Sequence, residues 1–298
     1  MKWVSYQAGG KEWYGVWNDD ASAVWNLAKI AEESGAAALP PSLIEAIRNG
    51  HAVETANRLI EYASGHHPSR YLDKEEDIRL LAPIPRPRKN IMCVGKNYRD
   101  HAIEMGSEKD IPAELMVFTK SPTSVAAPEQ TIEAHEAITS ELDYEGELAI
   151  IIGKGGRDIR ENEAFSHVFG YTIINDVTAR DLQTRHQQFF IGKSLDTSCP
   201  MGPWIVHHSA IKDPGSLDIT TKVNGEIRQQ SNTSLFIFPI QTIISVLSRG
   251  MTLEPGDIIA TGTPAGVGKG FHPPRFLKKG DKIEISIESI GVLANSVN

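Results

Sequence analysis

The sequence predicts an α+β protein in which a small α+β domain precedes a larger mixed β-sheet or sandwich. From residue 91 onward, short apolar segments follow one another with Gly and Pro between them, and one clear helix interrupts them, roughly from Thr178 to Phe189. This order does not alternate strand and helix as βαβ units would. A stretch rich in proline, with Pro83, Pro85 and Pro87, separates this part from a first segment of different texture.

We therefore divide the chain into a small N-terminal domain (1–82), a proline-rich connector (83–90) and a main domain (91–298). A chain of 298 residues can bury a sizeable core of this kind. In the first domain the pattern predicts a strand over 13–17 and helices over 20–34, 43–49 and 53–63. Ser42 and Glu45 form a capping box for the second helix.

The main domain is expected to consist of strands carried by short apolar segments. The residues that predict them are IMCVG, DYEGELAIIIG, FGYTIIND, PWIVHH, DIIATGT and KIEISIESIGVLANSV.

Composition excludes several classes of protein. The formal charge of −8, without any basic stripe, argues against a nucleic-acid surface. No segment approaches the ~18 apolar residues that span a bilayer, and the N-terminus lacks the apolar region of a signal peptide. The two cysteines, Cys93 and Cys199, have no metal-type spacing, so we expect reduced thiols in a cytoplasmic protein without a nucleic-acid or membrane partner.

Three acidic residues are the most informative feature of the chain. Glu145 and Glu147 are two residues apart ahead of the apolar run Leu148–Ile152, and Asp176 ends the apolar segment FGYTIIND. Alternate residues of a strand point to the same side, so the two glutamates can converge. Carboxylates beside a buried strand repel each other unless a cation lies between them. Oxygen ligands suit Mg²⁺, Mn²⁺ or Ca²⁺ better than zinc or copper.

The alternative interpretation is an exposed strand edge. Glu141 and Asp143 have the same parity as the pair, and four alternate acids are also typical of a solvated face.

Five ordered motifs then identify a family. The segments VGKNYRDHAIEMG, DYEGELA, INDVTARDLQ, GKSLDTSCPMGPW and IIATGTPAGVG follow one another between residues 94 and 268. Together they resemble the fumarylacetoacetate hydrolase family, over about two-thirds of the chain, and in particular its bacterial acylpyruvate hydrolases and oxaloacetate decarboxylases. The resemblance implies a mixed β-sandwich roll of the fumarylacetoacetate hydrolase C-terminal type, and a homodimer.

The resemblance implies that Glu145, Glu147 and Asp176 hold Mg²⁺ or Mn²⁺, with Ca²⁺ as an alternative. Three carboxylates and one divalent ion leave a charge near −1, with positions open for the carboxylate and keto oxygens of a 2-oxo acid. The metal can then stabilise an enolate as a Lewis acid.

The same resemblance assigns residues to the substrate. It places Arg180 and Gln183, three apart on one helical face, beside the metal, where they bind substrate or orient ligands. It makes Thr263 a hydrogen-bond donor to the substrate carboxylate. Lys193 becomes a catalytic residue that neutralises a substrate carboxylate or a developing oxyanion. Lys120 also matches a family lysine.

His101 and Glu104 are expected to form a catalytic dyad. At a spacing of three they can meet on a helical turn, and the glutamate would make the imidazole a better base. In the family such a pair activates water on a segment that closes over the substrate, and Gly95 and Gly106 bracket that segment here. Lys96 stands where related acylpyruvate hydrolases often have Arg.

The glycine-rich run ATGTPAGVGKG is not a nucleotide-binding loop. Five residues separate Gly262 from Gly268, and Gly270 stands where a Walker motif requires Ser or Thr. The resemblance makes this loop part of the active site.

These observations predict an enzyme that cleaves a C–C bond in a small 2-oxo or 2,4-dioxo acid through a metal-stabilised enolate, by acylpyruvate hydrolysis or oxaloacetate decarboxylation. Two alternatives stay open. One is an isomerase of unsaturated hydroxy-diacids, and the other is a metal-binding regulatory or scaffold protein with a protein partner.

Overall fold

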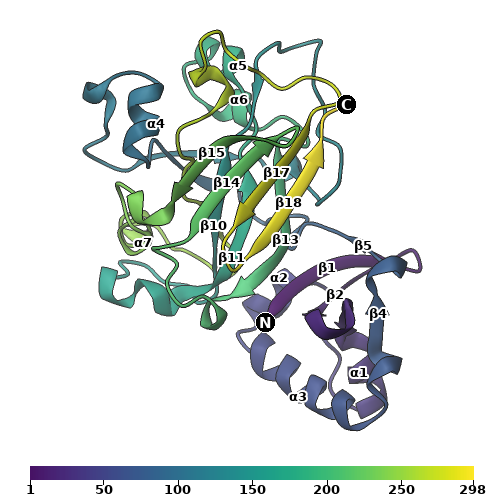
Figure 1. Cartoon of the computed structure of the whole chain (residues 1–298). Helices are drawn as coiled ribbons and strands as arrows, with labels where there is room; N and C mark the ends of the chain where they lie inside the picture. Colours follow the sequence, from purple (N-terminus) through teal and green to yellow (C-terminus); the bar gives the residue numbers. More distant parts are fainter.

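The architecture is built on one mixed sheet of twelve strands. A computed structural model describes all 298 residues and shows this sheet running from the N-terminal unit into the rest of the chain (Figure 1). Its strands are β1 (Lys2–Ala8), β2 (Lys11–Asn18), β3 (Ala23–Asn26), β4 (Leu72–Lys74), β5 (Arg79–Leu80), β6 (Ile91–Gly95), β7 (Met116–Lys120), β8 (Val125–Ala126), β10 (Gly146–Ile152), β11 (Val168–Asn175), β13 (Cys199–His207) and β16 (Ile258–Ala260).

The sheet is mixed because two of its strand pairs are parallel. The main path has the order β4-β3-β2-β1-β13-β11-β10-β16-β6-β7, while β5 pairs with β1 and β8 pairs with β13. The pairs β16–β6 and β13–β8 are parallel, and the others are antiparallel. The expected α+β fold with a large mixed sheet is confirmed.

A second sheet of four strands packs on one face of the first. Its order is β15-β14-β17-β18, with the bounds β14 (Asp218–Val223), β15 (Glu226–Asn232), β17 (Lys282–Ile287) and β18 (Gly291–Ser296). The expected strands near the C-terminus are present as the β17–β18 hairpin. The β14–β15 hairpin was not predicted, because its polar sequences DITTKV and EIRQQSN lack a long apolar run. A short pair joins β9 (Leu142–Asp143) to β12 (Thr178–Ala179).

Strand β10 separates two hydrophobic cores. Leu148, Ile150 and Ile152 lie in the core shared with the four-stranded sheet. Ala149 and Ile151 point the other way, into a core that also contains residues of the N-terminal unit. Both faces of this strand are buried, which explains why its sequence is a continuous apolar run rather than an alternation.

The N-terminal unit corrects one expectation. Its helices are α1 (Leu27–Ser34), α2 (Leu43–Arg48) and α3 (Ala52–Gly65), but residues 20–26 do not belong to the first of them. Val24 and Trp25 lie in β3 and pair with β2, so their apolar side chains serve a sheet rather than a helix face. The helix begins at an N-cap that was not predicted, where the Asn26 side chain accepts a hydrogen bond from Lys29 N. Of the capping box expected at Ser42, the structure shows the hydrogen bond that Ser42 Oγ accepts from Glu45 N.

The helix expected over 178–189 is also shorter. It consists of α5 (Arg180–Arg185), followed by a turn and the single turn α6 (Phe190–Lys193). Gly192 allows α6 to pack closely against the start of α5, because a Cβ there would lie 2.7 Å from Ala179 O and 2.6 Å from Gln183 N. Two further helices, α4 (Arg99–Glu104) and α7 (Ile240–Ser248), complete the fold, and α7 was not predicted.

The stretch between the two units, residues 81–90, contains no helix or strand, yet Ile84 in it is fully buried. Cys93 and Cys199 are buried free thiols. No helix has the length and apolar character needed to cross a membrane.

Candidate active site

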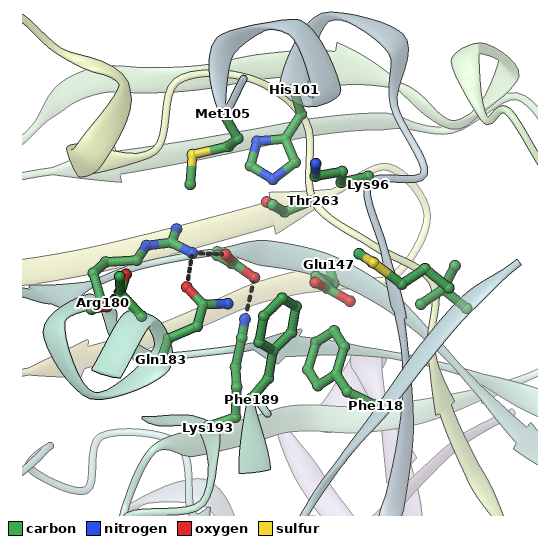
Figure 2. A pocket seen from close by; sticks show the side chains of 15 residues that line it. Lys96, His101, Met105, Phe118, Glu147, Arg180, Gln183, Phe189, Lys193 and Thr263 are labelled. Atoms are coloured by element: carbon green, nitrogen blue, oxygen red, sulfur yellow. Dashed lines mark hydrogen bonds and ion pairs between the residues drawn. The ribbon is translucent and has the colours of Figure 1, made fainter. Parts of the chain in front are cut away.

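A pocket of about 220 Å³ lies between α4, the start of β10 and the helices α5 and α6. Figure 2 shows His101 and Met105 on one side of it, with Arg180, Gln183 and Lys193 on the other. Glu145, Glu147 and Thr263 also line it, and its apolar wall is formed by Val94, Met105, Met116, Phe118 and Phe189. The pocket therefore brings together every sequence-predicted site residue except Glu104 and Asp176, which lie immediately behind it.

Three buried carboxylates converge as the sequence predicts. Glu145, Glu147 and Asp176 each offer one oxygen, and these oxygens lie within 4.8 Å of one another. All three side chains are almost completely inaccessible, so the alternative of a solvated acidic face is wrong. Glu147 and Ala149 have the same strand parity, which directs the glutamates away from the four-stranded sheet.

Three buried cations surround these carboxylates. Lys193 Nζ lies 2.7 Å from both Glu145 Oε2 and Asp176 Oδ2. Lys120 Nζ lies 2.7 Å from Asp176 Oδ1 and donates to Val177 O. Arg180 Nη1 lies 2.7 Å from Glu145 Oε1, and its Nε donates to Asp143 Oδ2 at 2.9 Å.

Arg180 retains one free donor. Its Nη1 also donates to Gln183 Oε1 at 3.3 Å, whereas its Nη2 is buried and has no hydrogen-bond partner. A buried guanidinium nitrogen without a partner is costly, so Arg180 is held at this place against an energetic penalty.

The surroundings shift the pKa values of Glu145 and Glu147 in opposite directions. Burial alone would raise the pKa of Glu145, but Lys193 and Arg180 hold it well below its usual value. Burial, together with Asp176 and Glu145, instead raises the pKa of Glu147 well above its usual value. Glu147 has only one hydrogen bond, from Gly262 N at 2.8 Å. Of the three carboxylates, it is the one that most needs an additional positive charge.

The donor set fits a hard divalent cation. With every group ionised, the four buried carboxylates, which include Asp143, and the three buried cations leave one negative charge. A divalent ion bound by oxygens of Glu145, Glu147 and Asp176 would make the cluster positive by one. The expected charge near −1 counts only the three ligands and the ion, whereas this count adds Asp143 and the cations Lys120, Arg180 and Lys193. A net positive site suits an anionic substrate.

His101 and Glu104 form the expected pair. The His101 Nδ1 to Glu104 Oε2 distance is 3.3 Å, and the imidazole is buried against the pocket. Because a carboxylate accepts, Nδ1 carries the proton and Nε2 has a free lone pair. Glu104 Oε1 in turn accepts from Gly266 N at 2.9 Å, which holds the pair against the glycine-rich loop.

The loop between Gly262 and Gly270 holds three acids of the site with its backbone amides. Gly262 N donates to Glu147, Gly266 N to Glu104, and Gly268 N to Asp143 Oδ1 at 2.6 Å. Lys269 N completes the set with a bond to Asp143 Oδ2 at 3.0 Å. The run is thus an anion-binding loop, but its anions are side chains of this chain rather than phosphates.

Asp143 is a site residue whose role was not predicted from the sequence. It is completely buried and joins Arg180 to the glycine-rich loop. Its only sequence signal was its parity with Glu145 and Glu147. Lys96, which also lines the pocket, has a left-handed backbone with φ of 52° and lies 3.7 Å from Asp110.

Comparisons with known proteins agree with this geometry. The family model "Fumarylacetoacetate (FAA) hydrolase C-terminal" matches residues 90–298. The chain is 58% identical to "Oxaloacetate tautomerase YisK" of Bacillus subtilis over 262 residues, which is 87% of each protein.

Solved structures give the same result over the whole chain. A fumarylacetoacetate hydrolase from Exiguobacterium antarcticum is 44% identical with a TM-score of 0.82, and covers 100% of this chain and 99% of its own. A 2-hydroxyhepta-2,4-diene-1,7-dioate isomerase from Mycobacterium marinum is 32% identical with a TM-score of 0.71, covering 100% and 98%. With its fold, its ordered motifs and its acidic cluster all in agreement, the chain belongs to the fumarylacetoacetate hydrolase family.

Proposed function

We propose that this protein is a divalent-metal-dependent enzyme that interconverts the keto and enol forms of oxaloacetate or a similar small 2-oxo diacid. The observation that carries the proposal is the placement of the His101–Glu104 pair across one small pocket from three convergent carboxylates. The 58% identity to a protein named oxaloacetate tautomerase supports the choice of substrate and reaction.

The pocket suits a small dianion. Its volume of about 220 Å³ is below the ~300–1,000 Å³ of sites for drug-sized ligands. Arg180 and Thr263 both line the pocket, where each can face a substrate carboxylate. A divalent ion held by Glu145, Glu147 and Asp176 would polarise the 2-oxo group and so make the neighbouring C–H bond more acidic.

His101 is the residue placed to move the proton. Its Nε2 can take a proton from the carbon next to the 2-oxo group, while the electron pair of the broken C–H bond forms the enolate. Return of that proton to oxygen gives the enol, and return to carbon gives the keto form. Glu104 fixes the tautomer with Nδ1 protonated and stabilises the imidazolium.

C–C bond cleavage is a second candidate, because two related reactions also form a metal-stabilised enolate, that of pyruvate. Loss of carbon dioxide from oxaloacetate forms the enolate of pyruvate and needs no base. Hydrolysis of an acylpyruvate needs a water molecule, whose proton His101 Nε2 would accept as the oxygen attacks the distal ketone. The C–C bond between that ketone and C3 then breaks, which releases a carboxylic acid and the enolate of pyruvate. Isomerases among the similar structures use related unsaturated diacids, as their names state.

One assay separates these reactions. Oxaloacetate and acetylpyruvate would be supplied with Mn²⁺ or Mg²⁺, while enol absorbance and pyruvate release are followed in the same sample. We expect accelerated keto–enol exchange that a chelator abolishes. His101→Ala should lower this exchange by about 10²-fold or more without weakening Mn²⁺ binding. If pyruvate release from oxaloacetate instead survives in His101→Ala, decarboxylation is the reaction.

Glu145→Ala tests the metal site itself. It should abolish both Mn²⁺ binding, measured by calorimetry, and turnover. Glu141→Ala is the matched control, because Glu141 lies in the same acidic run but outside the convergent group. Full turnover by Glu145→Ala would contradict the proposal.

A further inference from the structure

Gln229 lies behind the pocket and contacts Thr263, which lines it. It belongs to β15 in the four-stranded sheet, is completely buried, and extends its amide to the start of β10. Gly146, between the two metal-site glutamates, lets the four-stranded sheet come close to the start of β10 at Thr221. A Cβ at position 146 would lie 2.3 Å from Thr221 Oγ1 and 3.5 Å from Gln229 Oε1.

The contacts of Gln229 fix the orientation of its amide. Oε1 accepts a hydrogen bond from Gly146 N at 3.0 Å, and Nε2 donates to Pro264 O at 2.8 Å. A backbone N–H can only donate and a carbonyl can only accept, so the amide cannot be reversed. The second Nε2 proton must therefore be the one directed at Thr263 Oγ1, 2.7 Å away.

This orientation determines what the Thr263 hydroxyl can do. Its oxygen accepts from Gln229, so its own proton is not used in that contact. The proton is donated to Gly146 O at 3.0 Å, and Thr263 lines the pocket beside Glu147. Turning the proton from a neutral carbonyl to a substrate carboxylate would exchange an ordinary hydrogen bond for a stronger charge-assisted one.

We propose that Gln229 is a positioning residue that holds Thr263 Oγ1 and keeps its single proton available for a substrate carboxylate. This inference rests on the proposed function, because it assumes that a carboxylate lies against Thr263. Gln229 touches no substrate. Its effect is on the affinity for the carboxylate rather than on the proton transfer at His101.

The test is the affinity of the Mn²⁺-loaded protein for oxalate, measured by calorimetry, together with KM and kcat for oxaloacetate. Oxalate has two carboxylates and no C–H bond, so its binding does not depend on which reaction the enzyme performs. Gln229→Met keeps the length of the side chain but removes its donors. We expect oxalate binding and KM to weaken about tenfold, while kcat and Mn²⁺ affinity stay within about threefold of wild type.

A double-mutant cycle separates positioning from general loss of structure. Thr263→Val removes the hydroxyl, and in that background Gln229→Met should cause little further loss of oxalate affinity. Gln230→Met, an exposed neighbour on the same strand, is the matched control and should change nothing. If Gln229→Met fails to fold, Gln229→Glu replaces it in the same cycle, because a glutamate has at most one proton for two acceptors.

Two outcomes would overturn the inference: additive losses in the cycle, or unchanged oxalate affinity in the single variant. Failure of the proposed function gives a different result. In that case the wild-type protein would bind oxalate but would not convert oxaloacetate. The oxalate affinities in the double-mutant cycle would still test the role of Gln229.

Discussion

At the scale of single residues, Gly270 shows how closely the glycine-rich loop is fitted to the catalytic pair. A Cβ at this position would lie 2.2 Å from Glu104 Oε1 and 2.3 Å from its carboxyl carbon. The backbone there is not left-handed, so the absence of a side chain is needed for space and not for φ. Glu104 occupies the volume that a Ser or Thr of a phosphate-binding loop would fill.

Gly270→Ala should therefore displace the glutamate without unfolding the protein, since the obstructed atoms are the end of a flexible side chain. We expect turnover to fall about tenfold or more, because Nδ1 of His101 loses its acceptor, while the melting temperature changes little. Gly65→Ala, where a Cβ meets nothing within 4 Å, is the control. Normal turnover in Gly270→Ala would show that Glu104 is not needed where it lies.

The sequence could predict only part of this residue-level detail. Glu145, Glu147 and Asp176 were recognisable because each adjoins a long apolar strand, and the structure brings them together. Asp143 and Gln229 were not, because their roles are set by partners far along the chain. Asp143 contacts Arg180 and Gly268, and Gln229 contacts Thr263 and Gly146. Spacing along one strand carries no information about such partners.

At the scale of elements, two different segments bring a cation to the same carboxylate. Lys120 comes from β7 and Lys193 from α6, and each lies 2.7 Å from one oxygen of Asp176. Both ammonium groups are buried, so each depends on the acids around it for its charge. A bound divalent ion would compete with them for Asp176.

Lys120→Met should therefore change stability and metal affinity in opposite directions. Without metal we expect a loss of about 3–5 kcal/mol in the free energy of unfolding, because a buried acid loses a partner. Saturating Mn²⁺ should recover much of this loss, and Mn²⁺ should bind more tightly since one competing charge is gone. Urea unfolding with chelator and with Mn²⁺ would measure both effects.

Lys89→Met provides the comparison for that experiment. Lys89 pairs with Glu254 and Asp257, but it is 43% exposed and lies away from the pocket. Lys89→Met should lower the free energy of unfolding only slightly, and by the same amount with and without metal. An equal loss in both conditions for Lys120→Met would contradict the competition between Lys120 and the ion.

Element prediction succeeded where pattern and burial agree and failed where they do not. β10 and β11 are buried on both faces and have unmistakable apolar runs. The helix expected over 20–34 was predicted too long, because strand β3 leads directly into α1. The apolar residues of the strand and those of the helix therefore form one continuous series in the sequence. In the hairpin β14–β15, strand β14 alternates buried and less buried residues, while β15 has one buried residue, Gln229. Thr221 and Gln229 are buried but polar, so the sequence shows no apolar pattern at these positions.

At the scale of the whole molecule, the first eighty residues share both a sheet and a core with the rest. Strand β1 pairs with β13, at Lys2↔Val206 and Trp3↔Ile205. One hydrophobic core contains residues of α1, α2 and α3 together with residues of β10, β11 and β13. Figure 1 shows the N-terminal unit, in purple, attached at β1. Pairing between segments so far apart in sequence could not be predicted from local patterns, and the homodimer implied by the resemblance stays a prediction.

Trp3 tests whether this shared core makes the chain unfold as one unit. It is completely buried, and its ring lies 5.8 Å from that of Phe169 on β11. Trp3→Ala should lower the free energy of unfolding by about 3–5 kcal/mol, because it opens a cavity between the two units. If the units are coupled, intrinsic fluorescence and Mn²⁺ binding should be lost in one transition at the same urea concentration, in the wild type and in the variant.

Trp13→Ala is the control, because Trp13 is only half-buried on β2. It should lower the free energy of unfolding by less than Trp3→Ala does. Loss of N-terminal structure while the site near β10 still binds Mn²⁺ would instead show two independent domains, and the N-terminal unit would then be free to act apart from catalysis.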